Sequence, residues 1–156
     1  MLVAMEDNDF SEMILGLPPR GLRLPDSPVA PVAVLETLRS LASSIAADFT
    51  PAAWMFVEDG EVAGICSVVK PYVEGGIEIG YGVAPTRQRK GVTSRALAEL
   101  LTWARNDERV HEVIAECNMD NTASQIVLAR NGFVKTGQRV DEQDGNLICW
   151  SAKTLR

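Results

Sequence analysis

Apolar residues recur at steps of three and four positions in two stretches of the chain, the spacing that places them on one face of an α-helix. The first stretch covers residues 32–49, and Pro51 ends it because the residue before a proline avoids the helical region. The second covers residues 94–105. A further helix is predicted over residues 122–130, closed by Asn131 and Gly132, a frequent helix end. The apolar positions of the two periodic stretches are Val34, Leu35, Leu38, Leu41, Ala42, Ile45, Leu97, Leu100, Leu101 and Ala104.

Shorter apolar runs, rich in β-branched and aromatic residues, predict strands between and after these helices. The first two runs cover residues 54–57 and 62–69, and Asp59 and Gly60 between them are typical of a hairpin turn that needs positive φ. A third run follows over residues 77–83, so these three strands are predicted to form an antiparallel meander. The later runs cover residues 113–117, 133–137 and 147–150.

The first thirty residues carry a weaker pattern. Prolines at positions 18, 19, 25 and 28 disfavour a helix in this segment, and residues 21–24 fit a short first strand. The remaining order is helix, three strands, helix, strand, helix and two strands. This order predicts a single α/β domain of the α+β type over residues 1–156, with flanking helices around a mostly antiparallel central sheet.

Composition narrows the kinds of partner that the chain can bind. Of its 156 residues, 46% are hydrophobic and 23% are charged, which is usual for one globular domain. The formal net charge of −6 argues against nucleic acid and anionic membranes as partners, because both attract basic proteins. The sequence lacks a signal-peptide pattern at its start and has no run near the ~20 apolar residues of a membrane span, so a cytoplasmic location is expected.

Histidine and cysteine are too sparse for several kinds of site. His111 is the one histidine, and Cys66, Cys117 and Cys149 lie far apart in the sequence. Zinc sites need several such ligands close together, so no metal site is predicted. His111 lies in a charged stretch typical of an exposed connection, and the thiols fit buried cysteines in a reducing compartment.

The most informative segment is the basic stretch over residues 86–95, which joins a predicted strand to a predicted helix. It contains no acid, has Gly91 near the helix start, and carries the positive side chains of Arg87, Arg89, Lys90 and Arg95. A helix N-terminus attracts anions through its unpaired N–H groups, and glycine lets a phosphate approach the backbone. The stretch lacks the residue order of a P-loop and the glycines of a dinucleotide fingerprint. It predicts another kind of phosphate-binding turn, with a solvated basic loop as the alternative.

The strand before this turn has two different faces. Alternation places Glu78, Gly80 and Gly82 on one face, which suggests a groove with an acid or base at its end. The alternative for Glu78 is an ion pair or an exposed edge residue. Tyr81 lies on the opposite face between Ile79 and Val83, a position that favours the core.

Two segments of the chain have an informative residue spacing: Gln88, Gly91 and Thr93 after the strand over residues 76–85, and Asn121, Ser124, Gly132 and Phe133. Both resemble motifs of the GNAT superfamily of N-acetyltransferases, and the likeness covers about residues 54–150. The first segment is the strand over residues 76–85 followed by Gln88, Gly91 and Thr93, which is similar to the acetyl-CoA signature Q/R-x-x-G-x-G/A. Thr93 departs from the usual glycine or alanine. In this it is similar to the branch that includes ribosomal-protein-alanine acetyltransferases. The second segment has the spacing of the family's other motif, with Asn121, Ser124, Gly132 and Phe133.

The resemblance implies a GNAT-like domain whose central sheet has two splayed parallel strands, here residues 77–83 and 113–117. Acetyl-CoA, the acyl-donor substrate, would enter between them, and no metal is implied. The strand backbone near Val83 would pair with the pantetheine arm, which Asn121 and Ser124 would also contact. The residues implied for the pyrophosphate are Gln88, Arg89, Lys90, Gly91, Val92 and Thr93.

The resemblance also implies direct acetyl transfer to a primary amine of a small molecule or of a peptide or protein N-terminus. Glu78 is the expected base, acting through water, and a backbone N–H near Val83 or Ala84 is expected to polarise the carbonyl. Leu128 stands where many relatives have a tyrosine that acts as the general acid. The proton donor is therefore unassigned, and Ser124 is a weak candidate, because a serine hydroxyl is a poor acid.

Two other functions remain open at this point. One is a non-catalytic CoA-binding or interaction module, and the other is a nucleotide-phosphate binder of another class. The acceptor site would be shaped by the first predicted helix, residues 70–76 and the acidic residues 141–144. The acidic balance of the chain favours a cationic amine as the acceptor. The oligomeric state is left open, with a homodimer among the alternatives.

Overall fold

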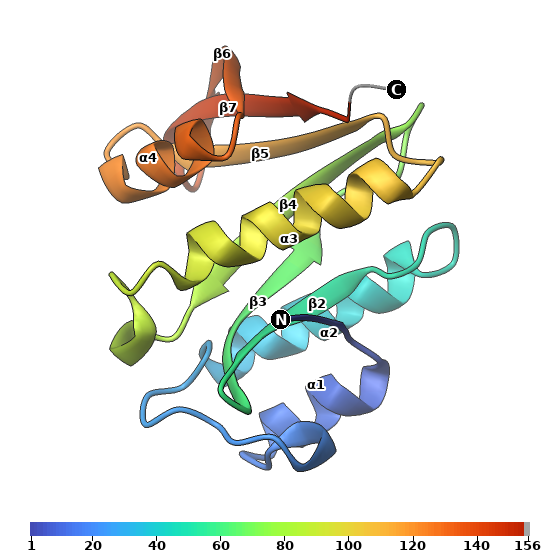
Figure 1. Cartoon of the computed structure of the whole chain (residues 1–156), viewed down its shortest axis with the longest axis vertical. Helices are drawn as coiled ribbons and strands as arrows, with labels where there is room; N and C mark the ends of the chain where they lie inside the picture. Colours follow the sequence, from blue (N-terminus) through green and yellow to red (C-terminus); the bar gives the residue numbers. More distant parts are fainter. Residues whose placement is uncertain (155–156) are drawn as a thin grey trace.

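The computed structural model describes residues 1–154 and contains a mixed sheet with the strand order β1-β2-β3-β4-β5-β7-β6 (Figure 1). Among the described strands only β4 and β5 pair in parallel, and all other neighbours are antiparallel. The strands are β1 (Leu2–Ala4), β2 (Ala53–Glu58), β3 (Glu61–Val68), β4 (Gly76–Val83), β5 (Glu112–Asn118), β6 (Val134–Asp141) and β7 (Gly145–Lys153).

Helices pack on both faces of this sheet. Leu97 and Leu100 of α3 pack with Ile77 and Ile79 of β4 in the larger core. In the view of Figure 1, α3 crosses in front of the sheet. On the other face, α1 and α2 pack on β2 and β3 around the fully buried Met55. The helices are α1 (Asp7–Ile14), α2 (Val32–Ile45), α3 (Val92–Asn106) and α4 (Thr122–Arg130), with short 3₁₀ helices η1 (Pro19–Gly21) and η2 (Pro85–Arg87).

The parallel strands β4 and β5 stay paired over only part of their length. Gly76–Ile79 lies beside Glu112–Ala115, and beyond these residues the two strands are no longer paired with each other. The far end of β4 remains paired with β3 up to Val83, and the far end of β5 remains paired with β7. A gap therefore opens between β4 and β5 inside the sheet, which confirms the splayed parallel pair.

The N-terminal segment differs from the prediction. The first strand is Leu2–Ala4, which pairs with β2, whereas the expected strand over residues 21–24 is reduced to one bridge between Arg23 and Glu61. The prediction that prolines disfavour a helix throughout the first thirty residues is wrong for α1, because all four prolines follow this helix. It begins with a reciprocal cap between Glu6 and Asp9, and it buries Phe10.

The other predicted elements are present with small changes in length. The helix predicted over residues 32–49 ends earlier, at Ile45, and Phe49 is a buried core residue whose ring stacks on Tyr72 with the centroids 4.9 Å apart. His111 is exposed, as expected. No helix within residues 1–154 is both long enough and apolar enough to cross a bilayer.

Candidate functional site

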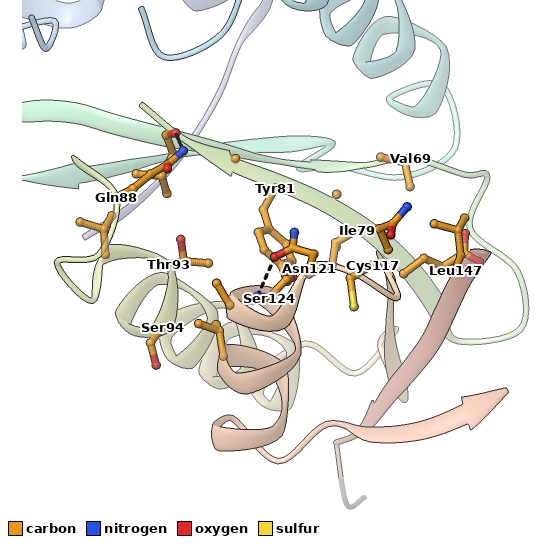
Figure 2. Close-up of a pocket in the computed structure, with 18 of the residues that line it drawn as sticks. Val69, Ile79, Tyr81, Gln88, Thr93, Ser94, Cys117, Asn121, Ser124 and Leu147 are labelled. Carbon is orange, nitrogen blue, oxygen red and sulfur yellow. Dashed lines mark hydrogen bonds between the residues drawn. The ribbon is translucent and has the colours of Figure 1, made fainter. Parts of the chain in front are cut away.

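A cavity of about 810 Å³ lies in the gap between the splayed ends of β4 and β5 (Figure 2). Its walls come from β4, the turn after it, the first residues of α3, the end of β5, the start of α4 and the β6–β7 hairpin. The predicted site residues that line it are Glu78, Val83, Gln88, Arg89, Gly91, Val92, Thr93, Asn121 and Ser124. Of the residues predicted to bind the donor, only Lys90 lies outside the lining, and it is exposed.

The turn at one end of the cavity is built from unusual backbone conformations. Arg89 and Gly91 both have positive φ, at 63° and 77°, and α3 begins directly afterwards at Val92. No side chain caps the first turn of α3. The first N–H groups of the helix are therefore free to receive an anion, as predicted for a phosphate-binding turn.

Two of the four basic side chains of this turn are already paired. Arg87 donates to the carboxylate of Glu61 at 2.5 and 2.9 Å, and Arg95 donates to Glu58 at 2.7 Å with both of its bonds. These hydrogen bonds hold the pKa of both carboxyl groups below the usual range. Within residues 1–154, Arg89 and Lys90 form no ion pair, so the uncompensated charge of the turn rests on them.

Backbone direction decides which amides of β4 face the gap. The N–H of Ala84 donates to the carbonyl of Ala63 on β3 at 2.8 Å. Because successive residues of a strand turn their N–H groups to opposite sides, the N–H of Val83 points toward the gap. The expectation that Ala84 could polarise a carbonyl is therefore wrong, and Val83 is the residue of the two whose amide is available.

At the start of α4, Asn121 caps the helix and Ser124 contacts a residue of β4 across the cavity. Asn121 accepts a hydrogen bond from the N–H of Ser124 at 3.0 Å and so caps α4. The Ser124 hydroxyl lies 2.6 Å from the Tyr81 hydroxyl of β4 (Figure 2). The Tyr81 ring packs against the core, as expected, but its hydroxyl reaches the cavity, and burial raises its pKa to about 12.

Glu78 also lines the cavity, although it projects from the face of β4 opposite to Tyr81. Its side chain is 15% exposed, and Lys70 lies 3.4 Å from its carboxylate. Burial raises the pKa of Glu78, the charge of Lys70 opposes that rise, and the nearby Glu116 adds to it. Glu78 therefore lines the cavity and also forms the ion pair that was given as its alternative role. Its carboxyl group titrates closer to neutral pH than that of an ordinary glutamate.

Comparison with known proteins identifies the domain. A family model described as an acetyltransferase (GNAT) domain matches residues 2–134 of the chain. The chain belongs to the GNAT acetyltransferase family. The expected resemblance is thus confirmed, and the order of elements and the splayed pair fit the expected fold.

Two relatives of this GNAT domain match about half of its sequence. "Uncharacterized N-acetyltransferase YjdG" of Bacillus subtilis (strain 168) is 33% identical over 84 residues, which are 52% of this chain and 50% of that protein. "Ribosomal-protein-serine acetyltransferase" of Escherichia coli (strain K12) is 29% identical over 86 residues, which are 54% of this chain and 48% of that protein. The chain spans about half the length of the curated relatives it matches.

Solved structures match the GNAT domain over nearly its whole length. A spermidine N-acetyltransferase SpeG mutant from Vibrio cholerae superposes with a TM-score of 0.71 at 18% identity, covering 99% of this chain and 95% of that one. The ribosomal L7/L12 alpha-N-protein acetyltransferase RimL, in complex with coenzyme A, gives 0.69 at 20% identity, covering 97% and 92%. At these identities the likeness concerns the fold.

Several residues of the cavity were missed by sequence reasoning. Arg139 of β6 reaches Glu116 of β5 at 2.5 and 2.8 Å, and its hydrogen bonds hold the pKa of that carboxyl below the usual range. Asn118 donates to the carbonyl of Asp144 at 2.7 Å and so ties the β6–β7 hairpin to β5. No local sequence pattern predicts these contacts, because they join residues that lie more than twenty positions apart in the sequence.

Leu128 is the GNAT domain's main departure from the family pattern. It is fully buried in the core and is absent from the cavity lining. Leucine has no ionisable group, so a proton donor has to come from a residue that lines the cavity.

Proposed function

We propose that this GNAT domain transfers the acetyl group of acetyl-CoA to a primary amine by direct attack. The observation that carries the proposal is the continuous cavity in the splayed sheet, which has an anion-binding turn at one end and a carboxylate of raised pKa at the other. One end suits the phosphates of the donor, and the other suits deprotonation of an amine.

The residues at the turn fit the donor substrate. The uncapped N–H groups at the start of α3 and the unpaired Arg89 and Lys90 suit a pyrophosphate. The backbone of Val83 faces the gap and suits the amide groups of a pantetheine arm. Gln88 donates to the carbonyl of Val83 at 3.4 Å, and that weak bond is readily exchanged for one to the donor. Asn121 and Ser124 line the opposite wall.

The other end of the cavity suits the acceptor. We assign Glu78 as the general base, acting through water, because its buried carboxylate binds a proton more strongly than an ordinary glutamate. The N–H of Val83 is assigned to the carbonyl oxygen of the thioester, where it would stabilise the charge that develops during attack.

The acceptor class follows from the carboxylates at this end. At this end Glu78, Glu116 and Asp144 line the cavity with Arg139. Lys70 lies 3.4 Å from Glu78, so the three carboxylates exceed the two cations by one charge. This charge pattern favours a cationic amine. The two named solved structures are described as acting on spermidine and on the N-terminus of ribosomal protein L7/L12, and both substrates present amines. Polyamines and protein N-termini are therefore the first acceptors to test.

The experiment is an acceptor screen read out as free thiol released from acetyl-CoA. The panel should contain polyamines, other small amines, amino acids, aminoglycoside antibiotics and peptides with free or blocked N-termini. We expect turnover with at least one amine and none with its acetylated form. CoA binding by calorimetry without turnover on the whole panel would favour the non-catalytic CoA-binding module. Stabilisation by ATP but not by CoA would favour a nucleotide-phosphate binder.

A further inference from the structure

We infer that Tyr81, paired with Ser124, supplies the hydrogen bond and the proton that the leaving sulfur of the donor requires. The inference rests on the proposed function and deepens it, because it assigns the acid that Leu128 cannot provide.

The two hydroxyl groups bridge the cavity between its walls. Tyr81 projects from β4 just beyond Ile79, the last residue that pairs with β5. Ser124 projects from the first turn of α4, where the Asn121 cap fixes its backbone. Their oxygens are 2.6 Å apart.

Counting protons shows what this pair can donate. Each hydroxyl carries one proton, and one of the two protons is used in the bond between them. Within residues 1–154 neither hydroxyl has a second hydrogen-bond partner. When Ser124 donates to the Tyr81 oxygen, the phenol proton of Tyr81 remains free for a group in the cavity. Because the pKa of Tyr81 is about 12, its hydroxyl stays protonated throughout the pH range in which enzymes usually work.

The position of Tyr81 along β4 is also suitable for a hydrogen bond to the leaving sulfur. Tyr81 lies between Val83, whose backbone faces the pantetheine path, and Glu78, where the amine is deprotonated. The reacting carbon and sulfur have to lie between these two points.

Among the other polar groups that line the cavity, Glu116 is held ionised by Arg139 and so has no proton to donate.

The step balances without any further reactant. A bond forms between the amine nitrogen and the carbonyl carbon, and the carbon–sulfur bond breaks with its electron pair on sulfur. A cationic acceptor first loses its ammonium proton to solvent, so that the neutral amine attacks. The sulfur then takes the free proton of the hydroxyl pair, while the second amine proton passes through water to Glu78. Solvent then returns a proton to the pair and removes one from Glu78, so the products are an amide and a neutral thiol.

The test compares Tyr81→Phe with the wild type by using two ligands, CoA and desulfo-CoA, in which hydrogen replaces the thiol. Calorimetry at pH 7.5 and pH 9.5 gives the preference for CoA over desulfo-CoA. In the wild type this preference should increase with pH as the bound sulfur ionises. In Tyr81→Phe the preference at the higher pH should fall about tenfold or more, because a hydrogen bond to a charged group is lost. General damage to the cavity would weaken both ligands and leave their ratio unchanged.

The matched control is Tyr72→Phe, which removes the hydroxyl of the other tyrosine of the chain. That hydroxyl donates to the carbonyl of Arg109, and Tyr72 does not line the cavity. Tyr72→Phe should keep the wild-type preference.

With an accepted amine, Tyr81→Phe should also lower kcat about tenfold or more while the KM for acetyl-CoA stays near the wild-type value. Ser124→Ala combined with Tyr81→Phe should lower kcat by less than the product of the two single effects, because the hydroxyls act as one unit.

An unchanged CoA preference and an unchanged kcat in Tyr81→Phe would overturn the inference and leave acetyl transfer intact. A wild-type protein that binds neither ligand would remove the proposed function and the inference together.

Discussion

Lys70 controls the charge state of the proposed base, and its removal gives a prediction with a definite sign. The Lys70 ammonium lies 3.4 Å from the Glu78 carboxylate and lowers a pKa that burial has raised. Lys70→Met removes the opposing charge, so the pKa of Glu78 rises further. A base must be ionised to work, and the acidic limb of the kcat/KM profile should therefore move to higher pH, with the plateau at alkaline pH unchanged.

The size of the effect follows from the exposure of the pair. The Lys70 side chain is 55% exposed, so water screens the attraction. Exposed ion pairs are worth about 0.2–1 kcal/mol in double-mutant cycles. On the acidic limb, where the rate is proportional to the ionised fraction of Glu78, this range corresponds to a loss of about 1.4- to 5-fold in kcat/KM. Added salt should make the difference smaller, because it screens the charge in the wild type.

The assay is the rate of thiol release from acetyl-CoA with the best amine of the screen, measured from acidic to alkaline pH. Lys153→Met is the matched control. Lys153 pairs with Glu112 at 3.1 Å, and neither residue lines the cavity, so this variant loses the same charge without moving the limb. A limb that stays in place in Lys70→Met, or moves to lower pH, would refute the assignment of Glu78 as the titrating base.

Four further predictions test the site and its support. Glu78→Gln should lower kcat about a hundredfold on the alkaline plateau and by less at acidic pH, where the wild-type carboxyl is itself protonated; a pH–rate profile with the wild-type acidic limb would contradict this. Gly91→Glu should abolish CoA binding in calorimetry, since it places bulk and negative charge at a turn where φ is 77° and a Cβ would lie 2.7 Å from Arg95. Arg89→Met should weaken the binding of CoA and reduce its salt dependence more than Arg95→Met does, because Arg95 is already paired with a carboxylate. Equal effects of the two substitutions would count against the unpaired Arg89 as the phosphate contact. Leu97→Ala should lower the free energy of unfolding by about 2–5 kcal/mol in urea titrations, because this fully buried side chain leaves a cavity under the sheet.

Local sequence signals predicted most of the elements but not the N-terminal segment. The helix over residues 92–106 was predicted from the apolar spacing of residues 94–105, and the helix over residues 122–130 from the Asn131 and Gly132 that end it. The helix α1 is short, and its stability depends on contacts beyond its own eight residues. Asp9, which is buried, pairs with Arg20 at 2.7 Å, and Met13 packs with Leu35 of α2. Periodicity within one segment carries no information about such partners.

In the candidate site, too, features encoded in consecutive residues could be predicted, whereas contacts between distant segments could not. The residues of the proposed phosphate-binding turn could be located from the sequence, because its charge, its glycine and the helix that follows are consecutive. The charge balance of the turn could not, because Glu58 and Glu61, which neutralise two of its arginines, come from the β2–β3 hairpin. Tyr81 shows the same limit: alternation placed it on the core side of β4, but its hydroxyl partner lies 43 residues later.

The sequence by itself therefore determined the family, the order of the elements and the consecutive residues of the turn, since each is encoded by spacing along one segment. The tertiary structure alone decided how the acceptor end is built. Lys70, Glu78, Glu116 and Arg139 meet there because β4 and β5 separate after Ile79 and Ala115, and the β6–β7 hairpin brings Arg139 across to β5. The charge state of each of these groups depends on burial and on neighbours from other strands, and only the folded chain brings them within hydrogen-bonding distance.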